Sequence, residues 1–173
     1  MNHLAPPLCL IIAGPNGAGK TTFARQLLPR AGVSEFINVD LIALGLAPLH
    51  PQTMQIQATR LFFQEFDRLS AAKASFAFES TLSGRSYLGR IQVLKAQGYH
   101  IQIYYLKVDA VKLSLQRVAH RVRQGGHDVP AEDIRRRFIK SWSNFNELYR
   151  PLADSWYVYD NSTPRLTLLE SSP

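Results

Sequence analysis

The chain has very little cysteine and no long apolar run, and each absence excludes a class of protein. Cys9 is the single cysteine among 173 residues, so no internal disulfide can form and a reducing compartment fits best. Because Cys9 lies in an apolar run, we expect a buried small hydrophobe rather than a reactive thiol. No segment approaches the about 18 consecutive apolar residues of a membrane span, and residues 1–7 lack the basic start of a signal peptide. These features predict a cytoplasmic protein without membrane contact.

Acidic residues are also scarce. Thirteen Asp and Glu stand against 20 Lys and Arg, which gives a formal net charge of +7. This balance favours an anionic partner, which could be nucleic acid, a membrane surface or a phosphorylated small molecule. Residues 110–140 hold eight of the basic residues and three acidic ones, a local net charge of +5. Most of the excess charge therefore belongs to one segment.

The length and the order of apolar segments predict a single α/β domain over residues 1–173. Short runs rich in β-branched and aromatic residues alternate with longer helix-like stretches, which is typical of a parallel sheet covered by helices on both faces. The expected strands are 8–14, 35–39, 75–79, 100–108 and 156–159. The expected helices are 19–28, 52–73, 86–97, 111–124 and 131–149. Residues 171–173 are expected to be a frayed end.

Two successive helices without an intervening strand break this alternation where the basic residues gather. The connection 125–130 contains His127, which we interpret as a loop residue held by local hydrogen bonds. The pair predicts a mobile helical lid over roughly residues 111–140. Four aromatic residues recur at helical spacing in and after its second helix and are expected in the core, namely Phe138, Trp142, Phe145 and Tyr149.

The segment Gly14-Pro15-Asn16-Gly17-Ala18-Gly19-Lys20-Thr21 matches the Walker A pattern G-x-x-x-x-G-K-[ST] and lies between an expected strand and helix. Glycines allow the backbone amides to approach the phosphates, and the helix N-terminus adds a positive dipole. Lys20 would contact the β- and γ-phosphates, and the Thr21 hydroxyl would bind Mg²⁺. The fold class is therefore a P-loop NTPase with a five-stranded, mostly parallel sheet. It is expected to bind ATP or GTP through Pro15, Asn16, Gly17, Ala18, Gly19, Lys20, Thr21 and Thr22.

Two further strand ends carry acids, and ligands of open α/β sheets lie outside the carboxyl ends of the strands. Asp40 could accept the proton of a substrate hydroxyl, or it could be the N-cap of a short helix. Glu79 could hold a water of the Mg²⁺ shell or a substrate hydroxyl. We predict both acids in the substrate site and Glu79, with Thr21, in the metal site.

Arginines of the lid would supply positive charge around the transferring phosphoryl group. Arg117 and Arg121 are four residues apart on one helix face, and Arg135 to Arg137 lie early in the next helix. A solvated face is the alternative interpretation for any one of them. Arg117 is predicted to contact ATP.

The order GPNGAGKTT, FINVD, FESTLSGRS, RVAHRVRQGGHDVP, IRRRF and YVYDNS resembles the zeta-toxin-like P-loop kinases, in particular a small branch of ATPases. The resemblance covers residues 10–162. It implies a kinase-type core with a helical lid, and the best-known members phosphorylate a sugar hydroxyl of UDP-N-acetylglucosamine and are held inactive by an antitoxin protein.

Several site residues follow from this resemblance. Asp40 matches the catalytic aspartate, Glu79 and Thr81 match the E-x-T substrate segment, and Arg121 and Arg136 match the arginines that grip the phosphates. Zeta toxins have an arginine two residues after the threonine, where this chain has Ser83, and Arg85 follows two positions later. Arg85 is therefore the predicted substrate contact.

The resulting prediction is an ATP- and Mg²⁺-dependent phosphotransferase that acts on a small hydroxyl-bearing substrate. Three alternatives stay open. An ABC-type ATPase is suggested by Leu82-Ser83-Gly84 and by the apolar run before Asp109, but the glycine and glutamine that continue that signature are lacking. A nucleic-acid kinase would explain the basic lid, with nucleic acid the less favoured partner. A switch-type ATPase would bind nucleotide without an acceptor.

Overall fold

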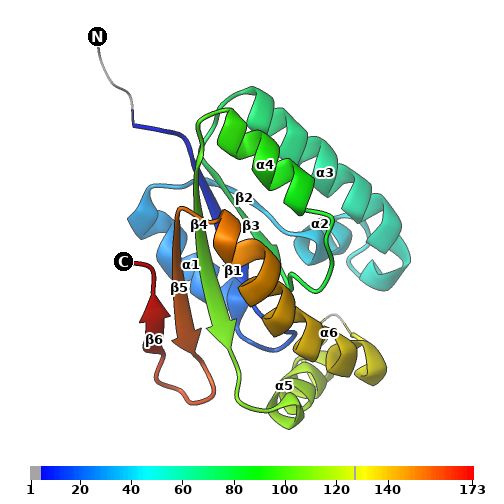
Figure 1. Ribbon diagram of the computed structural model, residues 1–173. Helices are drawn as coiled ribbons and strands as arrows, with labels where there is room; N and C mark the ends of the chain where they lie inside the picture. Colours follow the sequence, from blue (N-terminus) through cyan, green and yellow to red (C-terminus); the bar gives the residue numbers. More distant parts are fainter. Residues whose placement is uncertain (1–4, 127) are drawn as a thin grey trace.

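The computed structural model describes residues 5–126 and 128–173. His127 lies outside the described residues, as do residues 1–4. The strands are β1 (Leu8–Ala13), β2 (Glu35–Ile37), β3 (Phe76–Ser80), β4 (His100–Lys107), β5 (Ser155–Asp160) and β6 (Thr167–Ser171). The α-helices are α1 (Lys20–Ala31), α2 (Val39–Leu46), α3 (Gln55–Ala71), α4 (Leu88–Ala96), α5 (Val111–Arg123) and α6 (Ala131–Asn144). Figure 1 shows them arranged around one twisted sheet.

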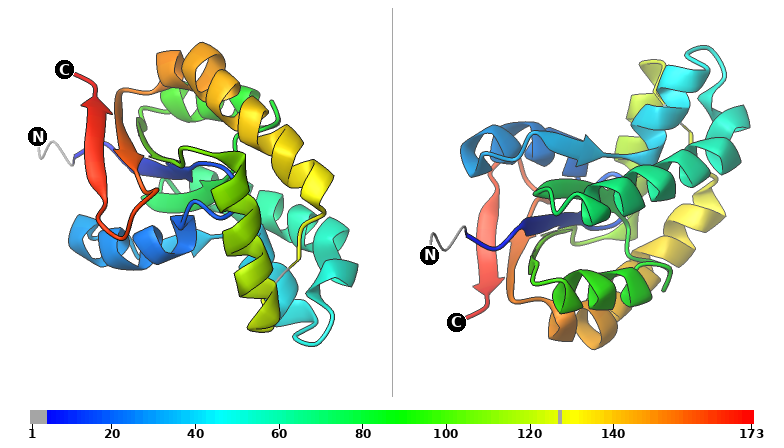
Figure 2. Two further views of the ribbon diagram at one scale, coloured as in Figure 1. Left: turned by 90° about the horizontal axis from the view of Figure 1, so that it is seen from below. Right: turned by 90° about the horizontal axis from the view of Figure 1, so that it is seen from above.

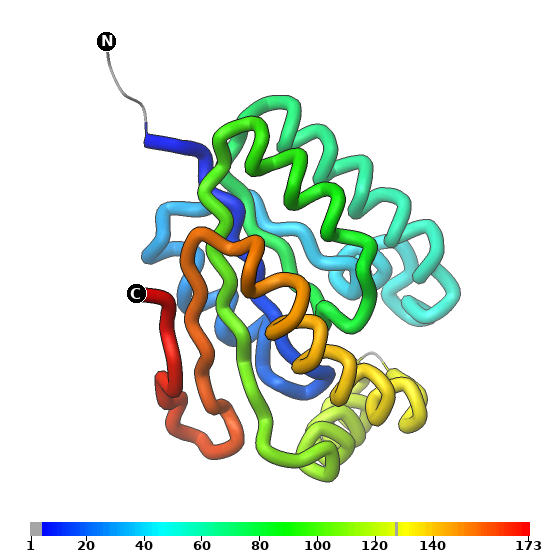
Figure 3. Tube along the Cα trace, viewed as in Figure 1, coloured from blue at the N-terminus to red at the C-terminus, as the bar shows by residue number. Residues whose placement is uncertain are grey.

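The strands form one sheet in the order β2-β3-β1-β4-β5-β6. The first five are parallel, and β6 pairs antiparallel with β5. Figure 3 shows the chain turning after β5 and returning beside it. The five-stranded core is confirmed, and β6 is an addition that the sequence did not reveal. The expected frayed end is wrong at its first two residues, because Ser171 pairs with Tyr157 and the backbone N–H of Ser172 donates to the carbonyl of Trp156.

Alternating side chains of the strands bury against helices on the two faces of the sheet. Ile11, Phe78 and Ile103 belong to a large cluster with side chains of α3, α4 and the turns after α6, whereas Leu10 and Ile12 pack against α1. Figure 2 shows α1 on one side of the sheet and α4 on the other. Phe145 and Tyr149 are fully buried, and Trp142 packs against them. The expected core position of these three aromatic residues is confirmed, whereas Phe138 is partly buried against a separate small cluster that includes Leu106.

Helix α2 begins almost immediately after β2, where the sequence predicted a strand over 35–39 and offered a short helix after Asp40 only as an alternative. Asn38 is its N-cap: the side chain accepts hydrogen bonds from the backbone N–H groups of Asp40 and Leu41. The next helix, expected over 52–73, begins with a 3₁₀ turn over Pro51–Met54 and continues as α3. The side-chain cap allows α2 to begin directly after Asn38, one residue beyond the end of β2.

Helices α5 and α6 form the expected hairpin, next to the carboxyl ends of β1 and β4 (Figure 1). A small cluster of Val118, Val129 and Ile134 joins the two helices. Among the described residues, no helix is both long and apolar enough to cross a membrane. Cys9 is free and fully buried, as expected, and this burial raises the pKa of its thiol.

Candidate functional site

The Walker A segment forms a tight loop between β1 and α1. Gly19 ends the loop with a φ of 82°, and a Cβ atom there would lie 2.6 Å from the side-chain amide nitrogen of Asn161. A residue with a side chain would therefore be both strained and obstructed. Pro15 and Ala18 supply backbone carbonyls that accept hydrogen bonds from Lys20 and Asn161, and Thr22 is exposed on α1.

Lys20 lies at the base of the loop, with only 7% of its surface exposed. Its ammonium group donates to the carbonyl of Pro15 at 3.0 Å and lies 3.7 Å from a carboxylate oxygen of Glu79. Burial lowers the pKa of Lys20, the nearby carboxylates of Glu79 and Asp40 raise it in part, and the charge of Arg121 lowers it further. Lys20 is therefore a desolvated cation that favours an anionic partner.

Glu79 stands at the end of β3 and joins three elements. One carboxylate oxygen accepts from the Thr21 hydroxyl and from the Asn38 amide, each at 2.7 Å, while the other faces Lys20. Thr21 and Glu79 thus present oxygens side by side, and oxygen is the ligand that Mg²⁺ prefers. The described residues contain no cluster of three metal-binding side chains, so a Mg²⁺ ion here would depend on these two oxygens together with phosphates and water.

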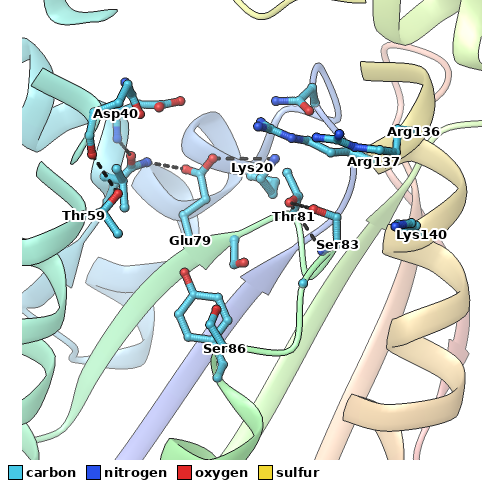
Figure 4. A pocket seen from close by; sticks show the side chains of 17 residues that line it. Lys20, Asp40, Thr59, Glu79, Thr81, Ser83, Ser86, Arg136, Arg137 and Lys140 are labelled. Atoms are coloured by element: carbon cyan, nitrogen blue, oxygen red, sulfur yellow. Dashed lines mark hydrogen bonds and ion pairs between the residues drawn. The ribbon is translucent and has the colours of Figure 1, made fainter. Parts of the chain in front are cut away.

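Asp40 lies in the first turn of α2, half-buried, and faces the same space as Lys20. The alternative interpretation of Asp40 as an N-cap is wrong, because Asn38 holds that position. In Figure 4, Asp40 and Thr59 lie on one side of Glu79 and Lys20, and the cations of α6 lie on the other.

A cavity of about 500 Å³ connects these groups. Its lining is mostly polar: it includes two acids, four cations, several hydroxyls and three side-chain amides. The cations are Lys20, Arg136, Arg137 and Lys140, and the hydroxyls come from Thr59, Ser80, Thr81, Ser83, Ser86 and Tyr87. Such a lining suits a charged ligand that carries several hydroxyl groups.

Helix α6 contributes the cationic wall of the cavity. Arg136 and Arg137 both contact the carboxylate of Asp133, at 2.6 and 3.5 Å, and Lys140 follows one turn later. Arg121 is not among the residues that line the cavity, although its charge acts on Lys20. Sequence reasoning counted all three α6 cations of the cavity in the basic segment but selected only Arg136. The spacing of Arg137 and Lys140 on one helix face was the available signal.

The E-x-T segment continues into a strained turn. Leu82 is fully buried and has a φ of 52°, an unfavourable value for a leucine. Asn144 donates to the carbonyl of Leu82 at 2.8 Å, and the Tyr149 hydroxyl donates to that of Gly84 at 2.7 Å. The end of α6 and the segment after it therefore hold the turn at residues 82–84 in place.

Thr81 and Ser83 share a hydrogen bond of 2.8 Å and face the cavity. Arg85 is exposed and is not among the residues that line it. In this arrangement Ser83, rather than Arg85, lies next to Thr81.

Arg117 contacts the loop backbone and is not among the residues that line the cavity. Its guanidinium group donates to the carbonyls of Gly17, Asn161 and Ser162, at 3.3, 2.8 and 3.2 Å. Asn161 in turn donates to the carbonyl of Ala18 at 2.8 Å. Two segments remote in the sequence thereby hold the nucleotide loop in shape, a role that sequence reasoning did not identify.

We expect Arg117→Met to lower the free energy of unfolding by about 2 kcal/mol, because partly buried carbonyls lose a charged hydrogen-bond donor. Chemical denaturation measures this change. The matched control is Arg123→Met, at an exposed position of the same helix, which should change stability by less than about 0.5 kcal/mol. Equal stability losses in the two variants would contradict a clamping role for Arg117.

Comparison with known proteins agrees with this geometry. Residues 9–139 match the AAA domain family, AAA_33, and the chain belongs to that family. An uncharacterized protein of Haemophilus influenzae is 33% identical over 125 residues, which cover 72% of this chain and 87% of the relative. The chain is therefore a P-loop domain, which implies that it binds a nucleoside triphosphate.

Solved structures place the fold among P-loop kinases and related toxins. A chain from the PezAT toxin-antitoxin system of Streptococcus pneumoniae superposes with a TM-score of 0.73 at 18% identity, over 97% of this chain and 72% of that one. A chain of the AvrRxo1-ORF1:ORF2 complex with ATP superposes with a TM-score of 0.74 at 18% identity, over 98% of this chain and 59% of that one. Shikimate kinase from Acinetobacter baumannii, in complex with shikimate, superposes with a TM-score of 0.52 at 21% identity, over 92% of this chain and 84% of that one. The resemblance to zeta-toxin-like P-loop kinases is confirmed at the level of the fold.

Proposed function

We propose that the chain is an ATP-dependent kinase that transfers the γ-phosphoryl group to a hydroxyl of a small anionic molecule, for example a sugar nucleotide such as UDP-N-acetylglucosamine. One observation carries this proposal: Lys20 of the nucleotide loop and Asp40 open onto the same polar cavity of about 500 Å³. A site that only hydrolysed or sensed ATP would not need a hydroxyl-lined cavity next to the phosphate position.

The residues divide into binding, activating and charge-stabilising groups. The loop amides and Lys20 would hold the triphosphate, so that the γ-phosphate points into the cavity. Thr21 and Glu79 would hold Mg²⁺, which supplies positive charge to the phosphate oxygens. Asp40 would accept the proton of the attacking hydroxyl, and the bond from that oxygen to phosphorus would form as the bond to ADP breaks.

The α6 cations would serve the acceptor and the transferring group. Arg136 and Arg137 are held by Asp133 at the cavity wall, and Lys140 lies one turn further. Movement of the α5–α6 lid toward α2 would bring these charges together and exclude water. Thr81 and Ser83 lie where they could bind further hydroxyls of the acceptor.

The direct test uses γ-labelled ATP with a defined panel of sugar nucleotides, phosphorylated polyols and short oligonucleotides. Label should pass to an anionic polyol or sugar nucleotide and not to oligonucleotides, and Lys20→Ala should abolish the transfer. Transfer to oligonucleotides alone would favour a nucleic-acid kinase. Release of labelled phosphate without any labelled acceptor would favour an ATPase.

Arg137→Ala should raise the KM for an anionic acceptor by about tenfold, because one charge-assisted contact is lost. Arg135→Ala is the matched control, since Arg135 is exposed on the same helix and does not line the cavity. Steady-state kinetics at saturating ATP separate the two variants. If both leave the KM unchanged, Arg137 does not bind the acceptor.

An antitoxin protein is the further partner that the resemblance to the PezAT system supports. Expression of the wild-type chain alone should then arrest bacterial growth, and expression of Lys20→Ala should not. Normal growth with both proteins would argue for a kinase without a toxic role.

A further inference from the structure

The side chain of Asn38 contacts both acidic residues of the site: the carboxylate of Glu79 and the backbone of Asp40. Only 5% of its surface is exposed. Its carbonyl oxygen accepts from the backbone N–H groups of Asp40 at 2.8 Å and Leu41 at 3.2 Å. Its amide nitrogen donates to Glu79 at 2.7 Å. One side chain therefore joins the helix that carries Asp40 to the carboxylate that faces the nucleotide loop.

The contact with Glu79 extends this connection to the Walker A residues. The oxygen of Glu79 that accepts from Asn38 also accepts from Thr21, and the other oxygen faces Lys20. A continuous set of hydrogen bonds thus runs from the loop through Glu79 and Asn38 to the backbone of Asp40. Charge-assisted hydrogen bonds in a buried setting fix geometry more firmly than exposed ones.

Helix capping alone does not explain an asparagine at this position. Aspartate and serine cap helices about as well as asparagine does. However, only asparagine among these offers an acceptor to the helix and, at the same time, an N–H donor to Glu79. Aspartate would place a second carboxylate 2.7 Å from that of Glu79, and the shorter serine side chain would not span both contacts.

We propose that Asn38 is a positioning residue that sets the placement of Glu79 relative to Asp40, so that metal, γ-phosphate and acceptor hydroxyl align. The part that concerns Asp40 rests on the proposed kinase function; the part that concerns Glu79 rests only on nucleotide and Mg²⁺ binding. Asn38 acts through its two neighbours and needs no contact of its own with the substrate.

Two variants separate positioning from capping. Asn38→Asp is isosteric and keeps the cap, but it removes the donor to Glu79. Asn38→Ser keeps the cap without adding charge. The matched control is Asn146→Asp: Asn146 donates to the carbonyl of Trp142 at 2.9 Å and does not line the cavity. The measurements are thermal unfolding, kcat and KM with labelled ATP and its acceptor, and ATP affinity with and without Mg²⁺.

We expect Asn38→Ser to unfold near the wild-type temperature yet to lose about tenfold in kcat, with little change in the KM for the acceptor. Asn38→Asp should lose at least as much, and Asn146→Asp should keep wild-type kinetics. Both Asn38 variants should also lose most of the gain in ATP affinity that Mg²⁺ provides, because the Glu79 oxygen beside Thr21 loses one of its two hydrogen-bond donors. Wild-type kcat in both folded variants would overturn the proposal.

The affinity measurement keeps this result separate from failure of the proposed function. If the wild-type protein transfers phosphate to no acceptor, the kinase proposal fails. The role of Asn38 toward Glu79 is then decided by ATP affinity alone. An undiminished effect of Mg²⁺ in both variants would show that Asn38 is only a helix cap.

Discussion

Replacement of Lys20 by alanine is expected to lower the affinity for MgATP by at least about a hundredfold and to abolish phosphoryl transfer. Lys20 is the buried cation at the base of the loop, 3.7 Å from Glu79. Without it, the phosphates lose their main side-chain cation, and Glu79 loses the charge that compensates it. Two anionic groups would then meet in a desolvated site.

Calorimetric titration with ATP in the presence of Mg²⁺ measures this loss. Lys112→Ala is the matched control, because Lys112 is exposed on α5 and does not line the cavity. Circular dichroism should show that both variants fold. Retention of MgATP affinity by folded Lys20→Ala would mean that the nucleotide does not bind at the Walker A loop.

Asp40→Asn should have the second large effect, on the rate of transfer and not on nucleotide binding. The substitution is isosteric and keeps the backbone N–H that donates to Asn38, so α2 should retain its start. Loss of the general base should lower kcat by about 10² to 10⁴, while ATP affinity should stay within about threefold because the loop contacts are intact.

Single-turnover measurements with labelled ATP and saturating acceptor test this expectation. Asp67→Asn is the control, since the Asp67 side chain is 61% exposed on the surface of α3. A switch-type ATPase would be indifferent to Asp40→Asn in both binding and turnover. Wild-type transfer in this variant would remove Asp40 from the catalytic role.

Local patterns made much of the fold and the centre of the site predictable from the sequence. A glycine-rich turn between an apolar strand and a helix specifies the nucleotide loop almost by itself, because backbone conformation limits which residues fit. Asp40 and Glu79 follow apolar strands, and parallel strands bring their carboxyl ends to one edge. Both acids therefore line one cavity, as the pattern indicated.

The contacts that organise the site depend on residues far apart in the sequence, and no local pattern shows them. Asn38 and Glu79 are separated by 41 positions, and Arg117 is 100 positions from the Gly17 carbonyl that it contacts. The packing of α5 and α6 against the rest of the chain decides which cations face the cavity, so helical periodicity alone did not show that Arg137 lines it and Arg121 does not. Likewise, all five residues of β6 are exposed. Its sequence therefore lacks the alternation of apolar and polar residues that indicates a half-buried strand.

Phosphorus NMR of the wild-type protein with ATP, Mg²⁺ and the acceptor panel tests the central claim most directly, because one spectrum distinguishes transfer to an acceptor from transfer to water. The account predicts growth of the ADP signals together with a new phosphomonoester resonance, and neither change with Lys20→Ala. ADP accompanied only by inorganic phosphate, or an unchanged ATP spectrum with every acceptor, would contradict it.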